Sequence, residues 1–455
     1  MEASFSGVIA FGFMASMLLL GVVARARLGF FRRLMIPASL LGGLFGFLLI
    51  SIGWGLGYGP EDFKLFTLHF FTLSFMSLCL TGPDEMPGKA PPAIFRGALW
   101  LSVIWVMSLC LQALLGIGVT DLLALFGDGA GMTPFQGAII ANGFTQGPGQ
   151  ALAYGSIWEQ SFGLHDIVSV GLIFASLGFA VSFLVGVPLA RWVASKRVAA
   201  GHGSQTLQVD VLSGILRAEN REPVGKSITH SANVDTLAYH IGLLGLAYVL
   251  TYFYIEFMLS VTDGMMMGKM PVATFFSYNL FFFHGLVVAT VLRVVLTRLG
   301  LARYFDTGTQ KMITGTAVDF MIVGTLMSIQ LSVLAAYLVP ILVVGGVVSL
   351  ATLALCFYYG SRSDSELGLL RALTLFGCCT GSAGTGLLLL RIVDPKFSTP
   401  IARELALFNI LITLLAAHLL MFMIPILPEV GLALGAAIYA ATLGAGFVAM
   451  RFIRA

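Results

Sequence analysis

The sequence predicts an all-α polytopic membrane protein, made of two inverted five-helix repeats that each hold a re-entrant hairpin, with one additional C-terminal helix. Composition is the first indication: 58% of the 455 residues are hydrophobic and only 10% are charged, whereas soluble domains carry about 25% charged residues. The second is a series of apolar runs near the roughly 20 residues that a membrane helix needs. The third is a pair of glycine-rich polar stretches, 143–150 and 377–386, which we call the first and second breaks.

The first repeat is predicted over residues 1–190. Its five membrane spans are expected near 6–23, 36–52, 63–80, 93–119 and 167–187. A re-entrant hairpin at about 133–155 holds the first break between the fourth and fifth spans. Several arginines follow the first span, and because Lys and Arg concentrate in cytoplasmic loops, they place the N-terminus outside.

A basic, polar stretch at 191–235 is predicted to be a cytoplasmic linker between the two halves. Because five crossings precede it, the second repeat, 236–425, starts on the opposite side of the membrane and is inverted. Its spans are expected near 237–261, 272–296, 314–338, 340–359 and 400–424, with a re-entrant hairpin at about 366–392. The remaining region, 426–455, is expected to form an additional transmembrane helix that leaves the C-terminus in the cytoplasm.

Charges beside the two breaks predict that the hairpins enter the membrane from opposite faces. Acidic loops flank the first break, and basic residues flank the second. Two such hairpins can meet near the midplane, which is where transporters built from inverted repeats hold their binding site.

The first break combines polar side chains with residues that disturb a helix. Lipid cannot hydrogen-bond an unwound backbone, so such a segment must be buried in protein or line a wet cavity. Pro148 disfavours helix at the residue before it, and freed N–H groups of the returning half-helix suit a carboxylate. A glycine-rich packing contact between helices is the alternative. The candidate substrate-binding residues here are Asn142, Thr145, Gln146, Gly147 and Gln150.

In the second break, hydroxyl side chains alternate with glycines, and the candidate substrate-binding residues are Thr380, Ser382 and Thr385. Packing of small residues between helices is a stronger alternative here, because Gly377 and Gly381 are four residues apart. Two further candidates are Arg403 and Asn409 in the tenth span. Arginine grips carboxylates through two hydrogen bonds, although anchoring at the cytoplasmic surface would also explain it.

Oxygen-rich positions in and near the breaks are candidates for binding Na⁺, the expected coupling ion. They are Gly143, Thr145, Gly381, Thr385 and Asp319. An acid within a membrane span is a functional candidate by default, although Asp319 lies near the cytoplasmic end of its span and could reach the interface. The chain shows no P-loop motif and no nucleophile–base pair, so we expect no enzymatic activity.

Three features resemble the bacterial glutamate:sodium symporter family. They are the start of the second span, IPASLLGGLFGFLL at 36–49, the fifth span at 173–192, and the pair of breaks. The resemblance covers most of residues 1–425 at low identity. It implies a homodimeric, elevator-type carrier in the bacterial cytoplasmic membrane that couples inward Na⁺ movement to glutamate uptake. The breaks depart from the family, whose glutamate carriers tend toward Gly-Gly-His-Gly and His-Cys-Gly-Phe-Gly, and the additional C-terminal helix is a third departure.

The function expected from these features is Na⁺-coupled symport of glutamate or a related dicarboxylic amino acid or organic anion. Its partners would be a small anionic substrate, the lipid bilayer and a second copy of the chain, with no nucleic acid. A proton-coupled carboxylate carrier is one alternative, which Asp319→Asn would distinguish. A non-transporting scaffold or a channel is another, although a channel favours a continuous polar stripe and the polarity here is concentrated in two hairpins.

Overall fold

The computed structural model describes residues 2–81, 92–126, 131–199, 213–221, 224–267, 270–363, 367–394 and 398–453. Within these residues the chain is helical apart from a short antiparallel pair, β1 (Met266–Met267) and β2 (Met270–Pro271). Eight of the described helices are long and apolar enough to cross a membrane. The predicted class, a polytopic all-α membrane protein, is confirmed. Parts of the predicted linker, 200–212 and 222–223, lie outside the described residues.

Helices of the first half follow the predicted spans closely. They are α1 (Glu2–Arg27), α2 (Gly29–Leu34), α3 (Ala38–Ser51), α4 (Pro60–Thr81), α5 (Pro92–Leu125), α6 (Pro134–Ala138), the π-helix η1 (Asn142–Gln146), α7 (Pro148–Phe162), α8 (Ile167–Leu184) and α9 (Gly186–Ala199). The predicted hairpin at 133–155 thus corresponds to α6, η1 and the first part of α7.

The second half contains more interruptions. Its elements are the 3₁₀ turn η2 (Ala218–Asn220), α11 (Thr236–Thr262), the 3₁₀ turns η3 (Val272–Phe276) and η4 (Tyr278–Leu280), α12 (Phe281–Arg298), the 3₁₀ turn η5 (Leu301–Tyr304), α13 (Thr307–Met327), α14 (Leu331–Ala336), α15 (Leu338–Ser361), α16 (Gly368–Thr380), α17 (Ala383–Val393), α18 (Ile401–Leu415), the π-helix η6 (His418–Met423), α19 (Leu427–Val430) and α20 (Leu432–Ala449).

Three predicted spans differ from the structure. The run at 314–338 is divided, because α13 ends at Met327 and the extended Gln330 directs its side chain to Glu61 before α14 begins. The run at 400–424 is α18 followed by a π-helix, and the run at 272–296 begins with 3₁₀ turns. Hydropathy does not show where the helices in these three runs begin and end, because an apolar run has the same composition whether its helix is continuous or interrupted.

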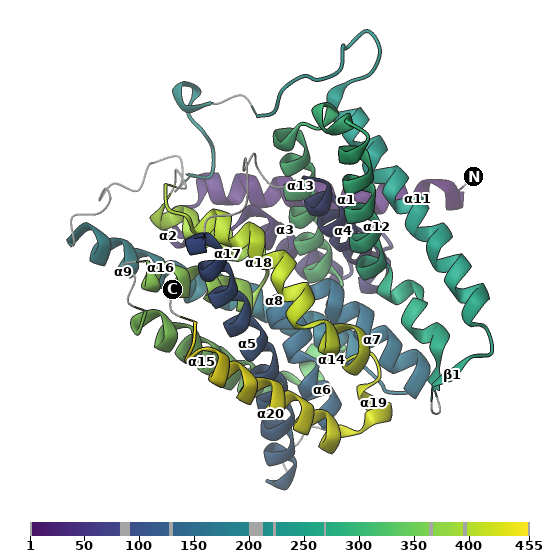
Figure 1. Cartoon of the computed structure of the whole chain (residues 1–455), viewed down its shortest axis with the longest axis vertical. Coiled ribbons are helices and arrows are strands. Elements are labelled where there is room, and N and C mark those ends of the chain that lie inside the picture. The colour runs from purple at the N-terminus through teal and green to yellow at the C-terminus, as the bar shows by residue number, and fades with distance from the viewer. Residues whose placement is uncertain are drawn as a thin grey trace.

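One bundle of the protein is built around α4 and α13, which pack along each other. Helix α3 packs against α13 as α12 packs against α4, and α1 packs against α3 as α11 packs against α12. The helices α1, α3 and α4 of the first half therefore have the same arrangement of neighbours as α11, α12 and α13 of the second half. Figure 1 shows α11 and α12 side by side at one edge of the molecule.

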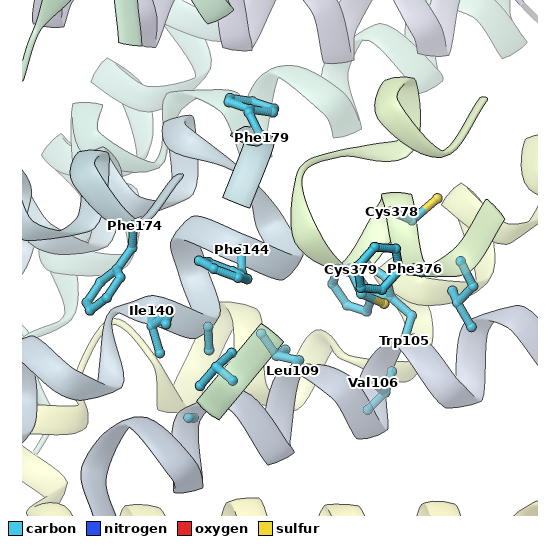
Figure 2. Close-up of a cluster of buried hydrophobic side chains, with 14 of the residues drawn as sticks. Trp105, Val106, Leu109, Ile140, Phe144, Phe174, Phe179, Phe376, Cys378 and Cys379 are labelled. Carbon is cyan, nitrogen blue, oxygen red and sulfur yellow. The ribbon is translucent and has the colours of Figure 1, made fainter. Parts of the chain in front are cut away.

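The second bundle is built around α5, the longest helix in the described residues. It contacts α6, α15, α18 and α20, and Figure 1 shows α5 and α20 running beside each other. Apolar side chains of both breaks, α5 and α8 form one buried cluster, with Phe144 among Phe174, Phe179 and Leu109 (Figure 2). This cluster excludes lipid from the backbone where the helices are interrupted.

The two bundles meet where α4 packs against α7 and α13 packs against α8. Helix α7 is anchored to the C-terminal part of the chain by two aromatic side chains. The hydroxyl of Tyr154 donates to the carbonyl of Leu420 at 2.8 Å, and the indole N–H of Trp158 donates to the carbonyl of Ile424 at 2.9 Å. The π-helix η6 therefore supports the hairpin that carries the first break.

Candidate functional site

The first break is a single change of backbone direction between two helical segments. The π-helix η1 ends at Gln146, and Gly147 adopts φ +97° and ψ 176° before α7 begins at Pro148. A positive φ of this kind is accessible to glycine and strained for other residues. Pro148 fits the first position of α7 because its missing N–H needs no partner there. Local sequence thus explains both the position and the shape of this break.

The second break lies between α16 and α17, at Gly381 and Ser382. Helix α17 closes its own N-terminus with a capping box: the N–H of Ser382 donates to Thr385 Oγ1 at 2.8 Å, and the N–H of Thr385 donates to Ser382 Oγ at 3.4 Å. The hydroxyl of Thr385 also donates to the carbonyl of Gly377 at 2.7 Å, which holds α17 against α16. Gly377 packs on Gly386, so this glycine serves the hairpin's internal packing.

The structure brings the two breaks into contact. A Cβ placed on Gly147 would lie 3.3 Å from the carbonyl oxygen of Gly381. Thr145 Oγ1 lies 3.2 Å from the carbonyl oxygen of Cys379, near the end of α16. Segments separated by more than two hundred residues therefore meet inside the second bundle, at one place.

Helix α8 supports both breaks through small residues on one face. A Cβ on Gly143 would lie 2.8 Å from the carbonyl oxygen of Gly171, and a Cβ on Gly178 would lie 2.3 Å from the carbonyl oxygen of Thr380. One turn further along α8, Ser182 Oγ lies 2.6 Å from Thr380 Oγ1. These close approaches require glycine, because a methyl group would overlap backbone atoms that cannot rotate away.

Gln112 of α5 links the two breaks and was not indicated by the sequence pattern. Its side chain is fully buried, its oxygen accepts a hydrogen bond from Thr145 at 2.7 Å, and its nitrogen donates to the carbonyl of Cys379 at 2.9 Å. The sequence does contain one signal for Gln112, which is an amide in the middle of an apolar span. Such a group must find polar partners inside the protein.

Comparison with known proteins identifies the family of this chain. The family model for sodium/glutamate symporters matches residues 4–360. The chain belongs to this family. No curated protein and no solved structure matches the chain. The matched region ends in the last turn of α15, so it includes the first break and stops before the second.

Three buried polar atoms in the first break and directly before it have no hydrogen-bond partner. They are Nδ2 of Asn142, Oε1 of Gln146 and Oε1 of Gln150, on side chains that are 1%, 5% and 7% exposed. The remaining amide groups of the first two pair with each other, since Gln146 Nε2 donates to Asn142 Oδ1 at 2.7 Å. An unpaired buried polar group costs about 1–3 kcal/mol, so three in one segment indicate a site for a polar ligand.

The N-terminus of α7 differs from that of α17 in a way that matters for an anion. No side chain caps α7, whereas Ser382 and Thr385 cap α17. The first residues of α7, Pro148 to Ala151, are buried. Uncapped N–H groups at the positive end of a helix favour a negative ligand, so α7 is the more suitable half-helix for a carboxylate.

Arg371 and Glu404 form a buried ion pair that ties the second hairpin to α18. Nε and Nη2 of Arg371 donate to the two oxygens of Glu404 at 2.8 and 2.6 Å, and the residues are 5% and 0% exposed. A Cβ on Gly97 of α5 would lie 2.3 Å from the carboxylate, so this glycine makes room for it. The charge of Arg371 is thereby balanced by Glu404, while its Nη1 is a buried donor without a hydrogen-bond partner.

The other predicted candidates lie apart from the contact between the breaks. Arg403 is exposed on α18, beside the inward-facing Glu404, and Asn409 donates Nδ2 to the carbonyl of Leu405 in its own helix at 2.9 Å. Asp319 is exposed on α13. Its neighbour Val318 lies 3.7 Å from the position of a Cβ on Gly384, so α13 passes beside the second hairpin.

A carboxylate closes the loop between the second hairpin and α18. Asp394 accepts hydrogen bonds from the N–H groups and hydroxyls of Ser398 and Thr399 at 2.7 to 2.9 Å. Burial acts to raise the pKa of Asp394, but these hydrogen bonds outweigh it and hold the pKa below its ordinary value. Asp394 is therefore ionised at neutral pH, and its hydrogen bonds join the end of α17 to the residues just before α18.

A polar pocket of about 380 Å³ lies where α4 meets α7 and α8. Its lining comes from both bundles and consists of Glu61, Lys64, Glu159, Leu164, His165, Asp166, Ser169 and Gln330. Most of these residues carry charge or an amide, so the pocket is a polar recess at the boundary between the bundles.

Proposed function

We propose that the protein is a secondary active transporter that couples Na⁺ movement to the uptake of glutamate or a related dicarboxylic amino acid or organic anion. The observation that carries this proposal is the contact between the two breaks, with unpartnered buried amide groups beside it. Membership of the sodium/glutamate symporter family supports it. A soluble anion can be held at membrane depth only where such polar groups replace its water.

The proposal assigns different ligands to different atoms of the site. A substrate carboxylate would accept hydrogen bonds from the uncapped N–H groups of α7 and from Asn142 Nδ2, with Gln146 and Gln150 accepting from a substrate ammonium group. Na⁺ would be held by Thr145 and by backbone oxygens near the breaks, including those of Gly143 and Gly381. The C-terminal end of α16 favours a cation there, because a helix dipole is negative at that end.

We propose that transport uses an elevator-type movement of the second bundle against the first. Around α4 and α13, the helices of the first half have the same arrangement of neighbours as those of the second half, which supports two inverted repeats. The charge pattern supports hairpins that open to opposite faces of the membrane. The N-terminus would lie outside and the C-terminus in the cytoplasm of a bacterial cell. A homodimer is part of the proposal, supported by the resemblance to the family.

Uptake of radiolabelled L-glutamate into proteoliposomes tests the function. We expect accumulation under an inward Na⁺ gradient, loss of accumulation when choline replaces Na⁺, and competition by other dicarboxylates. Uptake that ignores Na⁺ and follows a pH gradient would favour the proton-coupled alternative. If none of a panel of small anions is taken up under either gradient, the protein is not a carrier of this class.

Gln150→Leu is expected to raise the KM for substrate by about tenfold to a hundredfold, which corresponds to the roughly 1.5–3 kcal/mol of a hydrogen bond to a charged group. The thermal midpoint should stay at or above that of the wild type, because the substitution removes a buried oxygen that has no partner. Gln160→Leu, at the exposed end of the same helix, is the matched control. An unchanged KM for Gln150→Leu would remove this side chain from the site.

Asp319→Asn should leave Na⁺-driven uptake within about twofold of the wild type, because the proposed Na⁺ ligands lie at the contact between the breaks and Asp319 belongs to α13. The measurement is the initial uptake rate as a function of Na⁺ concentration. A large loss of Na⁺-driven uptake would instead make Asp319 part of the ion pathway.

A further inference from the structure

We propose that Gln112 is a positioning residue that keeps the hydroxyl oxygen of Thr145 and the carbonyl oxygen of Cys379 available as neighbouring ligands of the transported cation. The inference rests on the proposed function and adds a residue to it from α5, outside both breaks. It follows from counting the hydrogens and lone pairs of five buried groups.

The orientation of the Gln112 amide is determined by its surroundings. The carbonyl oxygen of Cys379 can only accept hydrogen bonds, so the amide group 2.9 Å from it must be Nε2. The second hydrogen of Nε2 is directed to Thr352 Oγ1, also at 2.9 Å, with Ser108 Oγ at 3.2 Å. The amide oxygen is left facing Thr145, at 2.7 Å. Every polar atom of this fully buried side chain has a partner.

This orientation decides where the single hydroxyl hydrogen of Thr145 points. Three acceptors lie within reach of it: Gln112 Oε1 at 2.7 Å, the carbonyl oxygen of Cys379 at 3.2 Å and Ser108 Oγ at 3.5 Å. The shortest contact takes the hydrogen, so the lone pairs of Thr145 Oγ1 are free on the side of Cys379. Without Gln112, the hydrogen would turn to the Cys379 carbonyl and occupy the space between the two oxygens.

The pair of oxygens suits a small cation. In an octahedral arrangement with metal–oxygen distances of about 2.4 Å, neighbouring ligand oxygens are about 3.4 Å apart. Thr145 Oγ1 and the Cys379 oxygen are separated by 3.2 Å. Cys379 also belongs to the last turn of α16, where carbonyls lack intrahelical partners and the helix dipole is negative. The two breaks thus contribute one oxygen each.

Gln112→Leu and Gln112→Glu test the inference through the Na⁺ dependence of uptake at saturating substrate. The leucine variant is expected to raise the half-saturating Na⁺ concentration by about tenfold or more, as loss of one charge-assisted contact would. The glutamate variant should depend on pH. When protonated, its carboxyl group has one O–H donor for Cys379 and one acceptor for Thr145, whereas the carboxylate has no donor. Its Na⁺ half-saturation should therefore approach the wild-type value at acidic pH and rise at alkaline pH.

Gln160→Glu is the matched control, because it introduces the same charge at an exposed position and should keep the pH profile of the wild type. Na⁺-dependent thermal stabilisation of the purified protein, measured without substrate, is a second readout. If the wild type shows neither Na⁺-dependent uptake nor Na⁺-dependent stabilisation, the proposed function itself fails. If the wild type shows both and the Gln112 variants keep its Na⁺ half-saturation, or lose only maximal rate, Gln112 is merely structural.

Discussion

Replacing Glu404 with alanine is expected to destabilise the protein by about 3–5 kcal/mol, the usual cost of leaving one partner of a buried ion pair uncompensated. Glu404 is 0% exposed and accepts two hydrogen bonds from Arg371, so its removal leaves a guanidinium in an apolar interior. The effect should appear as a large fall in the unfolding midpoint in detergent. Uptake should fall with it, because the pair attaches α16 to α18.

Two controls separate this effect from a general sensitivity to lost charge. Asp121→Ala removes an exposed acid from α5, and surface charges of this kind are worth about 0–1 kcal/mol. The double replacement Arg371→Met with Glu404→Leu should recover most of the lost stability, because no charge is then left buried. If Glu404→Ala unfolds at the wild-type midpoint, the ion pair does not hold the hairpin.

The second large effect is expected for Gly178→Val, which should abolish uptake. The new Cβ would lie 2.3 Å from the carbonyl oxygen of Thr380, which is a backbone atom at the end of α16. Relief requires α16 to move away from α8, and this movement would separate the two breaks. Overpacking of this kind also costs about 1–3 kcal/mol in stability, so uptake should fall far more than the unfolding midpoint.

Gly346→Val is the matched control, because a Cβ at this position in α15 meets nothing within 4 Å. It introduces the same side chain into another apolar helix and should transport like the wild type. Wild-type uptake by Gly178→Val would mean that close packing of α8 on the second break is not required. Equal loss in both variants would indicate that valine is poorly tolerated in these helices for a reason unrelated to the breaks.

Much of the fold could be predicted from local properties of the chain. Spans such as α5 and α15 follow from continuous apolar runs, and the turn at Gly147 follows from a glycine directly before a proline. The division of the run at 314–338 could not be predicted, because an apolar run has the same composition whether its helix is continuous or interrupted, as it is at Gln330. Domain boundaries and the orientation of the hairpins stay predictions from charge and spacing.

In the candidate site, too, the sequence indicated some of the residues and missed others. Thr145, Gln146 and Gln150 were indicated by their concentration in one glycine-rich segment. The structure places Thr145 beside the second break, and it leaves the amide oxygens of Gln146 and Gln150 buried without a hydrogen-bond partner. Arg403 was the residue that the sequence indicated, whereas the structure turns the adjacent Glu404 inward and leaves Arg403 facing outward. Which of these two adjacent charged side chains is buried depends on how α18 is rotated about its axis. Hydropathy averaged over a span does not show this rotation.

The sequence by itself determined that this is a multi-pass helical membrane protein with two glycine-rich interruptions, because hydropathy, glycine and proline act within a few residues of their position. Only the tertiary structure decided that the interruptions touch, that Gln112 links them and that α8 supports both. Gln112 and Cys379 are 267 residues apart, and the sequence between them carries no local signal of their hydrogen bond. Their roles depend on which helices pack together, which is a property of the whole bundle.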